Sequence, residues 1–470
     1  MRWRFGRAYA LMGLAGAAIG PAIVSDARAE TILGALGKAY VFSPDLGQQR
    51  AASRAADENV PRAASALRPT ISATASAGIF NNRVQSPANP LFGLPAYVLK
   101  NQTYPRNAGL TITQTLYNGN RAINSVRQAE STALSSHEQS RLSELMVLNA
   151  AATAYMDVLR DTALLALDQS NLHVLREQLS QSQARFKFGE ITRTDVSQSE
   201  AAVSQGEAVA STAQGNLQAS LATYSQLIGA PPRNLDPAQP PDRLLPATLD
   251  EAIAYAQREH PLIQAALHAA DAAALNVKVQ EGSLYPTVQV QGSVAQSWDA
   301  QSTPKEQTFN YGAMGTLNVP IYDGGLTYSN IRQAKEQLSQ ATLQADLQRE
   351  TIRQEVVAAW AGLRSTRANI RSFQAQIRAN EAALDGVRQE AKVGQRTTLD
   401  VLNAQQTLLI SRTNLVSAQR DQVVQTYNVL AAMGRLSAGG LGLAVATIDP
   451  RDHLDQVKDK AFGLRTPDGK

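Results

Sequence analysis

The chain of 470 residues contains no cysteine, few aromatic residues and, in two long stretches, no proline. Without cysteine it forms no disulfide bonds, and it cannot carry a lipid on an N-terminal cysteine. Aromatic residues make up 5% of the chain, which is little for one large dry core. No proline lies between Pro105 and Pro231 or between Pro320 and Pro450. Because proline interrupts helix interiors, both stretches can form helices far longer than the usual dozen residues.

The first 29 residues are typical of a signal peptide. A cluster of arginines precedes an apolar run over residues 8–24, and Ala27-Arg28-Ala29 has the small-x-small form of a cleavage site. We expect export with cleavage before Glu30; retention as a membrane anchor is the alternative, although the run is short for a span. Removing the leader lowers the formal net charge from +4 to about +1, so nucleic-acid binding loses most of its support. No later run of about 18 apolar residues predicts a membrane-spanning helix.

The chain repeats itself after 205 residues. Apolar residues spaced by seven, such as Val158, Leu165 and Leu172, recur at the same offset, and this period predicts a left-handed supercoil. Each copy predicts a long helix, a tight tip and a return helix, and a helix over about residues 119–188 would measure about 100 Å. Such helices fit a solvated rod or the wall of a hollow tube. The recurring residues are Tyr117, Gly119, Arg127, Gly189, Thr192, Asp195 and Gly229, matched by Tyr322, Gly324, Arg332, Gly394, Thr397, Asp400 and Gly434.

Two strand-like segments precede each long helix. Apolar and small polar residues alternate over residues 69–80, 110–117, 288–294 and 310–321. This alternation fits a transmembrane β-barrel with a wet interior, and it also fits a soluble sandwich. The export signal and the edges that four strands leave unpaired favour the barrel. Four strands cannot close alone. Two chains would supply eight strands around an interior filled by side chains, whereas three chains would supply twelve strands around a channel, so we expect a trimer.

The region before the strands repeats after 217 residues instead. Pro44 and Pro69, for example, recur as Pro261 and Pro286. The difference of 12 residues falls in the first hairpin, so we expect a long outer loop of Asn, Pro and Gly over residues 81–106, longer than its counterpart near residues 298–308. Pro61, which is replaced by Lys278 in the second copy, predicts a local kink.

Proline also marks the boundary between the copies. Six of the 20 prolines lie within residues 231–246, which predicts a rigid extended linker. We therefore divide the chain into a signal peptide (1–29), a first repeat (30–230), a linker (231–247), a second repeat (248–435) and a C-terminal segment (436–470). Each repeat is expected to hold a helix, a β-hairpin, a long helix and a return helix.

Capping residues define the expected helix ends. Threonine and aspartate three residues apart have the form of a capping box, with Asp in place of the usual Glu. Gly189 and Gly394 fit left-handed C-cap positions at the two tips. The expected helix caps are Thr192, Thr397, Asn118 and Asp323.

Several segments resemble the TolC family of outer-membrane efflux and secretion ducts. They are residues 317–325 (Leu-Asn-Val-Pro-Ile-Tyr-Asp-Gly-Gly), 393–397 (Val-Gly-Gln-Arg-Thr), 400–404 (Asp-Val-Leu-Asn-Ala) and 431–436 (Ala-Ala-Met-Gly-Arg-Leu). The resemblance covers nearly all of the chain after the leader. It implies a mixed α and β membrane protein: a trimeric duct with four β-strands per chain in a 12-stranded outer-membrane β-barrel, and a long α-helical coiled-coil periplasmic barrel. The linker and C-terminal segment would form a belt around its middle. The absence of cysteine resembles the unlipidated secretion-type branch.

The resemblance also implies two sites. Asp400 would face the tunnel axis at the periplasmic mouth, where three copies form a ring that attracts cations and helps to hold the mouth closed. Family members often carry a second acid where this chain has Asn403, so weaker cation sensitivity is expected. Capping alone would also explain both tip aspartates. The aperture residues are Asp400, Asn403, Arg396 and Asp195; the tip residues expected to contact a periplasmic adaptor are Phe188, Gly189, Val393 and Gly394.

Enzymatic motifs are missing from the sequence. It has no phosphate loop, metal-binding histidine spacing or nucleophile elbow, and its five scattered histidines are expected at the solvated surface. We expect no enzymatic activity, cofactor or metal. The expected function is the outer-membrane exit duct of a tripartite type I secretion or efflux system in a Gram-negative bacterium. Its partners would be further copies of the chain, outer-membrane lipid, a periplasmic adaptor and an inner-membrane ABC or proton-driven transporter. The alternatives are an exported coiled-coil structural protein without channel activity and a general porin.

Overall fold

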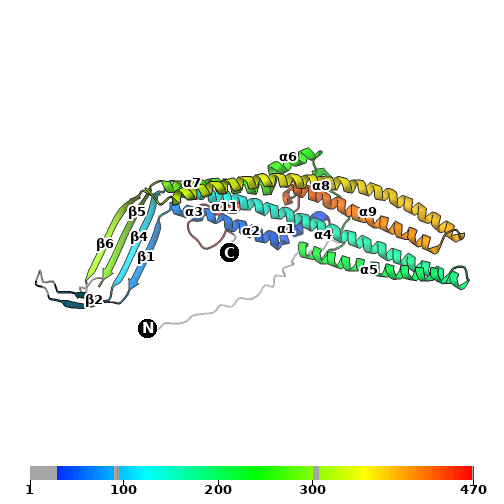
Figure 1. Cartoon of the computed structure of the whole chain (residues 1–470), viewed down its shortest axis with the longest axis horizontal. Coiled ribbons are helices and arrows are strands. Elements are labelled where there is room, and N and C mark those ends of the chain that lie inside the picture. The colour runs from blue at the N-terminus through cyan, green and yellow to red at the C-terminus, as the bar shows by residue number, and fades with distance from the viewer. Residues whose placement is uncertain (1–28, 89–92, 94, 300–305, 468, 470) are drawn as a thin grey trace, which may run out of the picture.

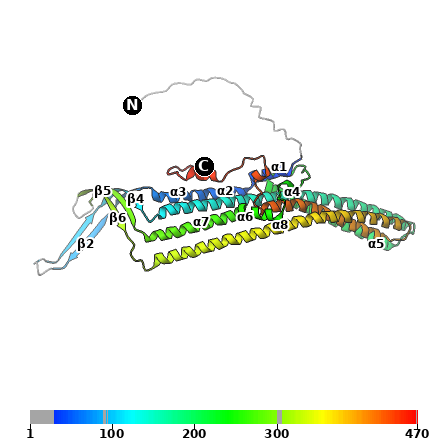
Figure 2. The same cartoon turned by 90° about the horizontal axis from the view of Figure 1, so that it is seen from above.

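A computed structural model describes residues 29–88, 93, 95–299, 306–467 and 469. The expected signal peptide, up to residue 28, lies outside the described residues. The chain is elongated, with a β-sheet at one end and two helical tips at the other (Figure 1). Shorter helices lie beside the half of the long helices that is nearer the sheet (Figure 2). Within the described ranges, no helix is both long enough and apolar enough to cross a membrane.

Two long helices form the axis of the molecule. Helix α4 (Arg121–Lys187) and helix α8 (Leu326–Lys392) each have 67 residues, or about 100 Å. Each turns back at the far end into a return helix, α5 (Arg193–Ile228) or α9 (Thr398–Ala432). The predicted seam residues Val158, Leu172 and Leu363 are buried. The two internal repeats and their paired long helices are thus confirmed.

Four strands form one antiparallel sheet in the order β1-β4-β5-β6. They are β1 (Thr70–Ala77), β4 (Arg106–Tyr117), β5 (Thr287–Trp298) and β6 (Gln307–Asn318). The first hairpin therefore pairs with the second through β4 and β5, and β1 and β6 are edges with no partner strand among the described residues. The expectation that the last strand includes Val319 and Ile321 is wrong, because β6 ends at Asn318.

The long outer segment of the first hairpin is not a simple loop. Strands β2 (Phe80–Ser86) and β3 (Tyr97–Thr103) pair with each other as a separate two-stranded sheet beyond the main one (Figure 1). The expected loop over residues 81–106 is corrected accordingly: the extra residues extend the hairpin. Most of its expected counterpart, near residues 298–308, lies outside the described residues.

Shorter helices cover the half of α4 and α8 that is nearer the sheet. In the first half these are α1 (Ile32–Phe42), α2 (Pro44–Asp57) and α3 (Asn59–Ala64). In the second half they are α6 (Leu249–Glu259) and α7 (Pro261–Glu281). The interruption at Glu58 matches the predicted kink, because Pro61 has no N–H to donate to the carbonyl of Asp57. Short 3₁₀ turns η1 (Ser65–Leu67), η3 (Asp242–Leu244) and η4 (Gly282–Leu284) complete the connections.

The best-packed core lies at mid-length. Residues of α1, α4, α5 and α9 meet there, among them the fully buried Leu36, Leu148 and Tyr155. The Tyr155 hydroxyl donates to the carbonyls of Glu30 and Asp236, at 2.6 and 2.7 Å, and so ties the start of the described chain and the linker to α4. Each fully buried leucine contributes about 1.5–3 kcal/mol, so this cluster stabilises the level at which α1 and both helical hairpins meet.

The C-terminal segment runs from this core toward the sheet. It contains α10 (Ala438–Leu441) and α11 (Arg451–Val457), which packs on α2 through the fully buried Val457. Arg68, just before β1, donates to the carbonyls of Asp459 and Lys460. The segment therefore extends past the middle of the molecule, alongside α2.

Candidate functional site

The two tips have the same backbone geometry. Gly189 and Gly394 adopt left-handed conformations, with φ of +76° and +77°. The following residues close the turns, with Glu190 donating to the carbonyl of Arg185 at 3.0 Å and Gln395 to that of Glu390 at 2.9 Å. A side chain at either glycine would meet nothing within 4 Å. The glycines are therefore needed for backbone conformation and leave an open surface around them.

An apolar side chain precedes each tip glycine. Phe188 is 83% exposed and Val393 is 72% exposed. Each hairpin tip thus carries one exposed apolar side chain next to its glycine.

Capping boxes begin both return helices. The Thr192 Oγ1 accepts from the Asp195 amide at 3.3 Å, while the Asp195 carboxylate accepts from the Thr192 amide at 3.0 Å. Thr397 and Asp400 repeat the arrangement at 3.2 and 2.9 Å. The hydrogen bonds from threonine lower the pKa of Asp195 and of Asp400 below the ordinary value. Both aspartates therefore carry a full negative charge at neutral pH.

The other aperture residues do not join these aspartates in the single chain. The Arg396 Nε lies 2.8 Å from Glu390 Oε2 and so forms an ion pair within its own hairpin. Asn403 is exposed and lines a groove of about 410 Å³ between the hairpins, next to the buried Gln405. Among the described residues, no hydrogen bond links Asp195 to Asp400 or Asn403.

The expected caps of the long helices require a correction. The residues at the N-cap positions are Asn120 and Gly325, both left-handed. Asn118 lies two residues earlier and accepts from the Ala122 amide at 3.4 Å. Asp323 likewise accepts from the amides of Gly325 and Thr327, at 3.1 and 2.8 Å. Both side chains cap the helix from outside the N-cap position, because a glycine follows each of them and turns the chain.

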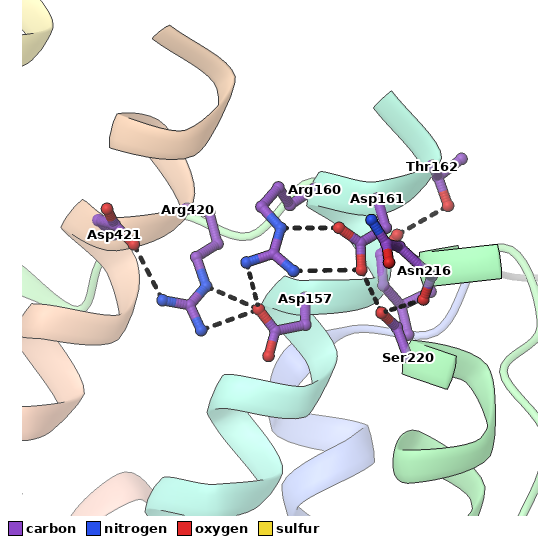
Figure 3. Close-up of polar contacts among 9 residues, drawn as sticks. Asp157, Arg160, Asp161, Thr162, Asn216, Ser220, Arg420 and Asp421 are labelled. Atoms are coloured by element: carbon purple, nitrogen blue, oxygen red, sulfur yellow. Dashed lines mark hydrogen bonds and ion pairs between the residues drawn. The ribbon is translucent and has the colours of Figure 1, made fainter. Parts of the chain in front are cut away.

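A polar network at mid-length joins three helices (Figure 3). Arg420 Nη2 on α9 lies 2.8 Å from Asp157 Oδ1 on α4, and Arg420 Nη1 lies 2.9 Å from Oδ1 of the neighbouring Asp421. Arg160 bridges Asp157, at 3.0 Å, to Asp161, at 2.7 Å. The hydroxyl of Ser220 on α5 completes the network by donating to Asp161.

The electrostatics of this network favour fully charged groups. Burial would raise the pKa of Asp161, but the hydrogen bonds from Arg160 and Ser220 outweigh it and hold the pKa below its usual value. The bond to Asp161 raises the pKa of Arg160. This network was not predicted from the sequence. A usable signal was present, since charged residues at i, i+3 and i+4 on α4 occur in the first copy of the repeat only.

The expectation of five solvated histidines is wrong for three of them. His137 and His260 are each 3% exposed, and the side chain of His453 is 10% exposed. His137 Nε2 and His453 Nδ1 lie 2.6 and 3.0 Å from the two oxygens of the buried Asp57. The cluster fastens α11 to α2 and α4. No group of side chains in the described part of the chain has the arrangement of a metal site.

Comparisons with known proteins identify the family to which the chain is similar. A family model described as outer membrane efflux protein matches residues 35–230 and 252–435. The chain is 40% identical over 446 residues to the outer membrane efflux protein BepC of Brucella suis biovar 1 (strain 1330), a match that covers 94% of each chain. It is 25% identical over 390 residues to the outer membrane protein TolC of Escherichia coli (strain K12), with 76% of each chain covered.

A solved structure shares the fold. The Campylobacter jejuni CmeC outer membrane channel superposes with a TM-score of 0.74 at 16% sequence identity. The superposition covers 91% of this chain and 89% of that chain.

Proposed function

We propose that this chain, which belongs to the outer membrane efflux protein family and is an exit duct, acts as a homotrimer whose periplasmic tips open on contact with an adaptor. Family membership removes support from the exported structural protein as an alternative. The family is one of channel proteins, and we propose no catalytic role for the chain.

The unclosed sheet is the observation that carries this proposal. Strands β1 and β6 have a free edge each, and nearly all residues of β1 and β6 are exposed in the single chain. Unpaired edges invite pairing with another chain. Three copies would supply twelve strands, enough to surround a channel, and would place six helical hairpins around its continuation. A general porin would have no use for helices of about 100 Å.

The tips suit contact with a partner that lies deeper in the periplasm. Phe188 and Val393 are exposed apolar residues beside glycines that leave room for close approach. We infer that Phe188, Gly189, Val393 and Gly394 meet the hairpin tips of a periplasmic adaptor. The energy for transport would come from an inner-membrane ABC or proton-driven transporter, since the chain has no nucleotide-binding motif.

The aperture is proposed to lie at the same end. Asp400 is ionised and partly exposed near the start of α9, so three copies would place three negative charges around the axis. Asp195, Arg396 and Asn403 would complete the surrounding polar surface. Arg396 is held by Glu390 in the single chain, so we infer that any bond between hairpins at this level is made by assembly of the trimer.

The remaining segments fit the same assembly. We propose that residues 1–29 are removed on export, and that the linker 231–247 and the segment 436–470 form the belt around the middle of the duct, with the end of the segment reaching from the belt toward the sheet. A cysteine-free chain is consistent with an unlipidated duct of the type I secretion branch. The duct itself would accept varied cargo, with selection left to its partners.

Membrane fractionation combined with gel migration tests the proposal. The protein should be found in the outer-membrane fraction and should migrate as a trimer unless heated before electrophoresis. Purified protein should form channels in planar lipid bilayers. Recovery only from the soluble periplasm, or a monomer without conductance, would refute the duct.

A further inference from the structure

The network of Figure 3 is the polar link between the two hairpins that lies nearest the tips. Closer to the tips, every polar side-chain contact between helices in the described ranges stays within one hairpin. Toward the sheet, Asn149 and Asn428 add a second link between hairpins at 3.0 Å. The contacts within hairpins are Arg176–Glu207, Ser182–Ser199, Asn380–Ser411 and Glu381–Arg412.

The link lies far from the tips. Thirty residues separate Asp157 from the end of α4 at Lys187, which corresponds to about 45 Å of helix. Over this length the two hairpins are neighbours without a polar side-chain bond, and a groove of about 410 Å³ separates part of them. Between this link and the tips, polar bonds therefore hold the two helices of each hairpin together, whereas the two hairpins are less firmly held to each other.

Comparison of the two copies of the repeat shows that this link occurs at one of two equivalent places only. The ion pair Arg176–Glu207 in the first hairpin has its counterpart in Glu381–Arg412, at the same offset of 205 residues and with the charges exchanged. The link between hairpins has no such counterpart. The positions equivalent to Asp157 and Arg420 are Gly362 and Gly215.

The rest of the network is also replaced by uncharged residues. Arg160 and Asp161 correspond to Ser365 and Thr366. In the proposed trimer, the contact of α4 with α9 inside one chain would alternate with the contact of α8 with α5 of the next chain. Charged links would therefore occur at three of the six seams between hairpins, and facing glycines at the other three.

We propose, on the basis of the proposed function, that Asp157 and Arg420 form a pivot: the ion pair holds the two hairpins of one chain together while their tips move. The seam between chains, which carries Gly362 and Gly215, is the one that slides when the duct opens. Separating the partly buried ion pair would leave charges without partners, whereas facing glycines have no side chains to separate. Asp157 and Arg420 are positioning residues in this proposal, and they touch no cargo.

Neutralising the pair tests the pivot. Without the ion pair the two hairpins of one chain can also move apart at the mouth, so Asp157→Asn and Arg420→Gln should each raise the time-averaged current of purified trimers in planar bilayers by roughly tenfold. The double variant should be no more conductive than either single variant, because the two residues act as one link. Arg412→Gln is the matched control: it removes an arginine from the same helix, but its partner Glu381 lies within the hairpin. Wild-type current in both single variants, or additive increases in the double variant, would overturn the pivot.

Installing the link at the other seam is an independent test. Gly215→Arg combined with Gly362→Asp should lower both current and export, while each single variant should remain close to wild type. A side chain at Gly215 meets nothing within 4 Å, and one at Gly362 meets only the side chain of Gln425. Trimer migration on gels confirms folding. Unchanged current in a folded double variant would overturn the sliding seam, whereas absence of trimers or current in the wild type would instead refute the proposed function.

Discussion

The aspartates at the tips combine a structural role with an electrostatic one. Each accepts hydrogen bonds from its capping threonine and stays ionised for that reason. A cap of this kind contributes about 1 kcal/mol to the stability of its helix. Each side chain keeps its charge and stays partly exposed to solvent while it caps the helix, so capping is compatible with the proposed aperture role.

Substituting Asp400 by Asn separates the two roles. Asparagine keeps an oxygen that can accept from the Thr397 amide, so the cap is retained while the charge is lost. We expect block of single-channel current by a trivalent cation to weaken about fivefold or more, since one charge contact in water contributes about 1 kcal/mol. Asp195→Asn, the equivalent change in the other hairpin, is the control and should have a smaller effect. Unchanged block in Asp400→Asn would place Asp400 away from the aperture.

His260 gives the mid-region a defined acid sensitivity. Burial, assisted by the nearby Arg141, lowers the pKa of His260 to about 4. Its Nδ1 accepts from the Leu262 amide at 3.2 Å, so the neutral ring caps α7. Because the folded state binds the proton more weakly than the unfolded state, stability is complete above pH of about 6.5 and falls as the pH is lowered to about 4.

The His260→Asn variant tests this. Asparagine is a good N-cap residue but does not titrate in this range. Between pH 7 and pH 4.5, the wild-type trimer should lose about 2–3 kcal/mol more stability per chain than the variant. Apparent melting temperatures in detergent at both pH values measure the difference. Equal losses in both proteins would assign the acid sensitivity to other groups.

At the scale of elements, the long helices were predictable and the outer hairpin was not. Helices that pack along their whole length tolerate no insertion, so an unbroken offset of 205 residues predicted two helices of equal length. The β2–β3 hairpin was missed because Asn, Pro and Gly between residues 81 and 106 dominate the pattern, although only part of that segment turns.

Contacts between distant parts of the chain left no periodic signal. Asp157 and Arg420 are 263 residues apart, and Asp57 and His453 are 396 apart. Each position alone fits a solvated surface residue. Which of them meet depends on how α2, α4, α9 and α11 pack, and that packing became visible only in the folded chain.

The tip glycines allow backbone strain to be separated from docking. Gly394→Ala and Gly394→Trp both place a side chain at φ of +77°, which costs about 1–2 kcal/mol in either case. Because nothing lies within 4 Å, neither variant clashes within the chain. We expect Ala to support export near the wild-type level and Trp to abolish it while trimers persist. Normal export by the Trp variant would remove this tip from the adaptor contact.

At the scale of the whole molecule, the single chain has edges and apolar surfaces that further copies of the chain would cover. Its sheet has free edges at β1 and β6, and its exposed apolar residues include Ile71 on β1 and Tyr311 on β6. Its two helical hairpins pack side by side as a partial wall. Closure by rotation of identical copies would satisfy the sheet and the wall together.

The absence of cysteine makes that closure directly testable. In a closed ring, β6 of one copy runs antiparallel to β1 of the next, at Cα separations of about 4.5–5.5 Å that a disulfide can bridge. A cysteine at Ser72 on β1, combined in turn with one at each of residues 310–316 on β6, should therefore yield covalent trimers on non-reducing gels at one or two positions. Ser72 paired with Ser293 on the central strand β5 is the control and should yield monomers. Covalent dimers without trimers would indicate eight strands closed by two chains, and failure of the whole series would show that these edges do not meet.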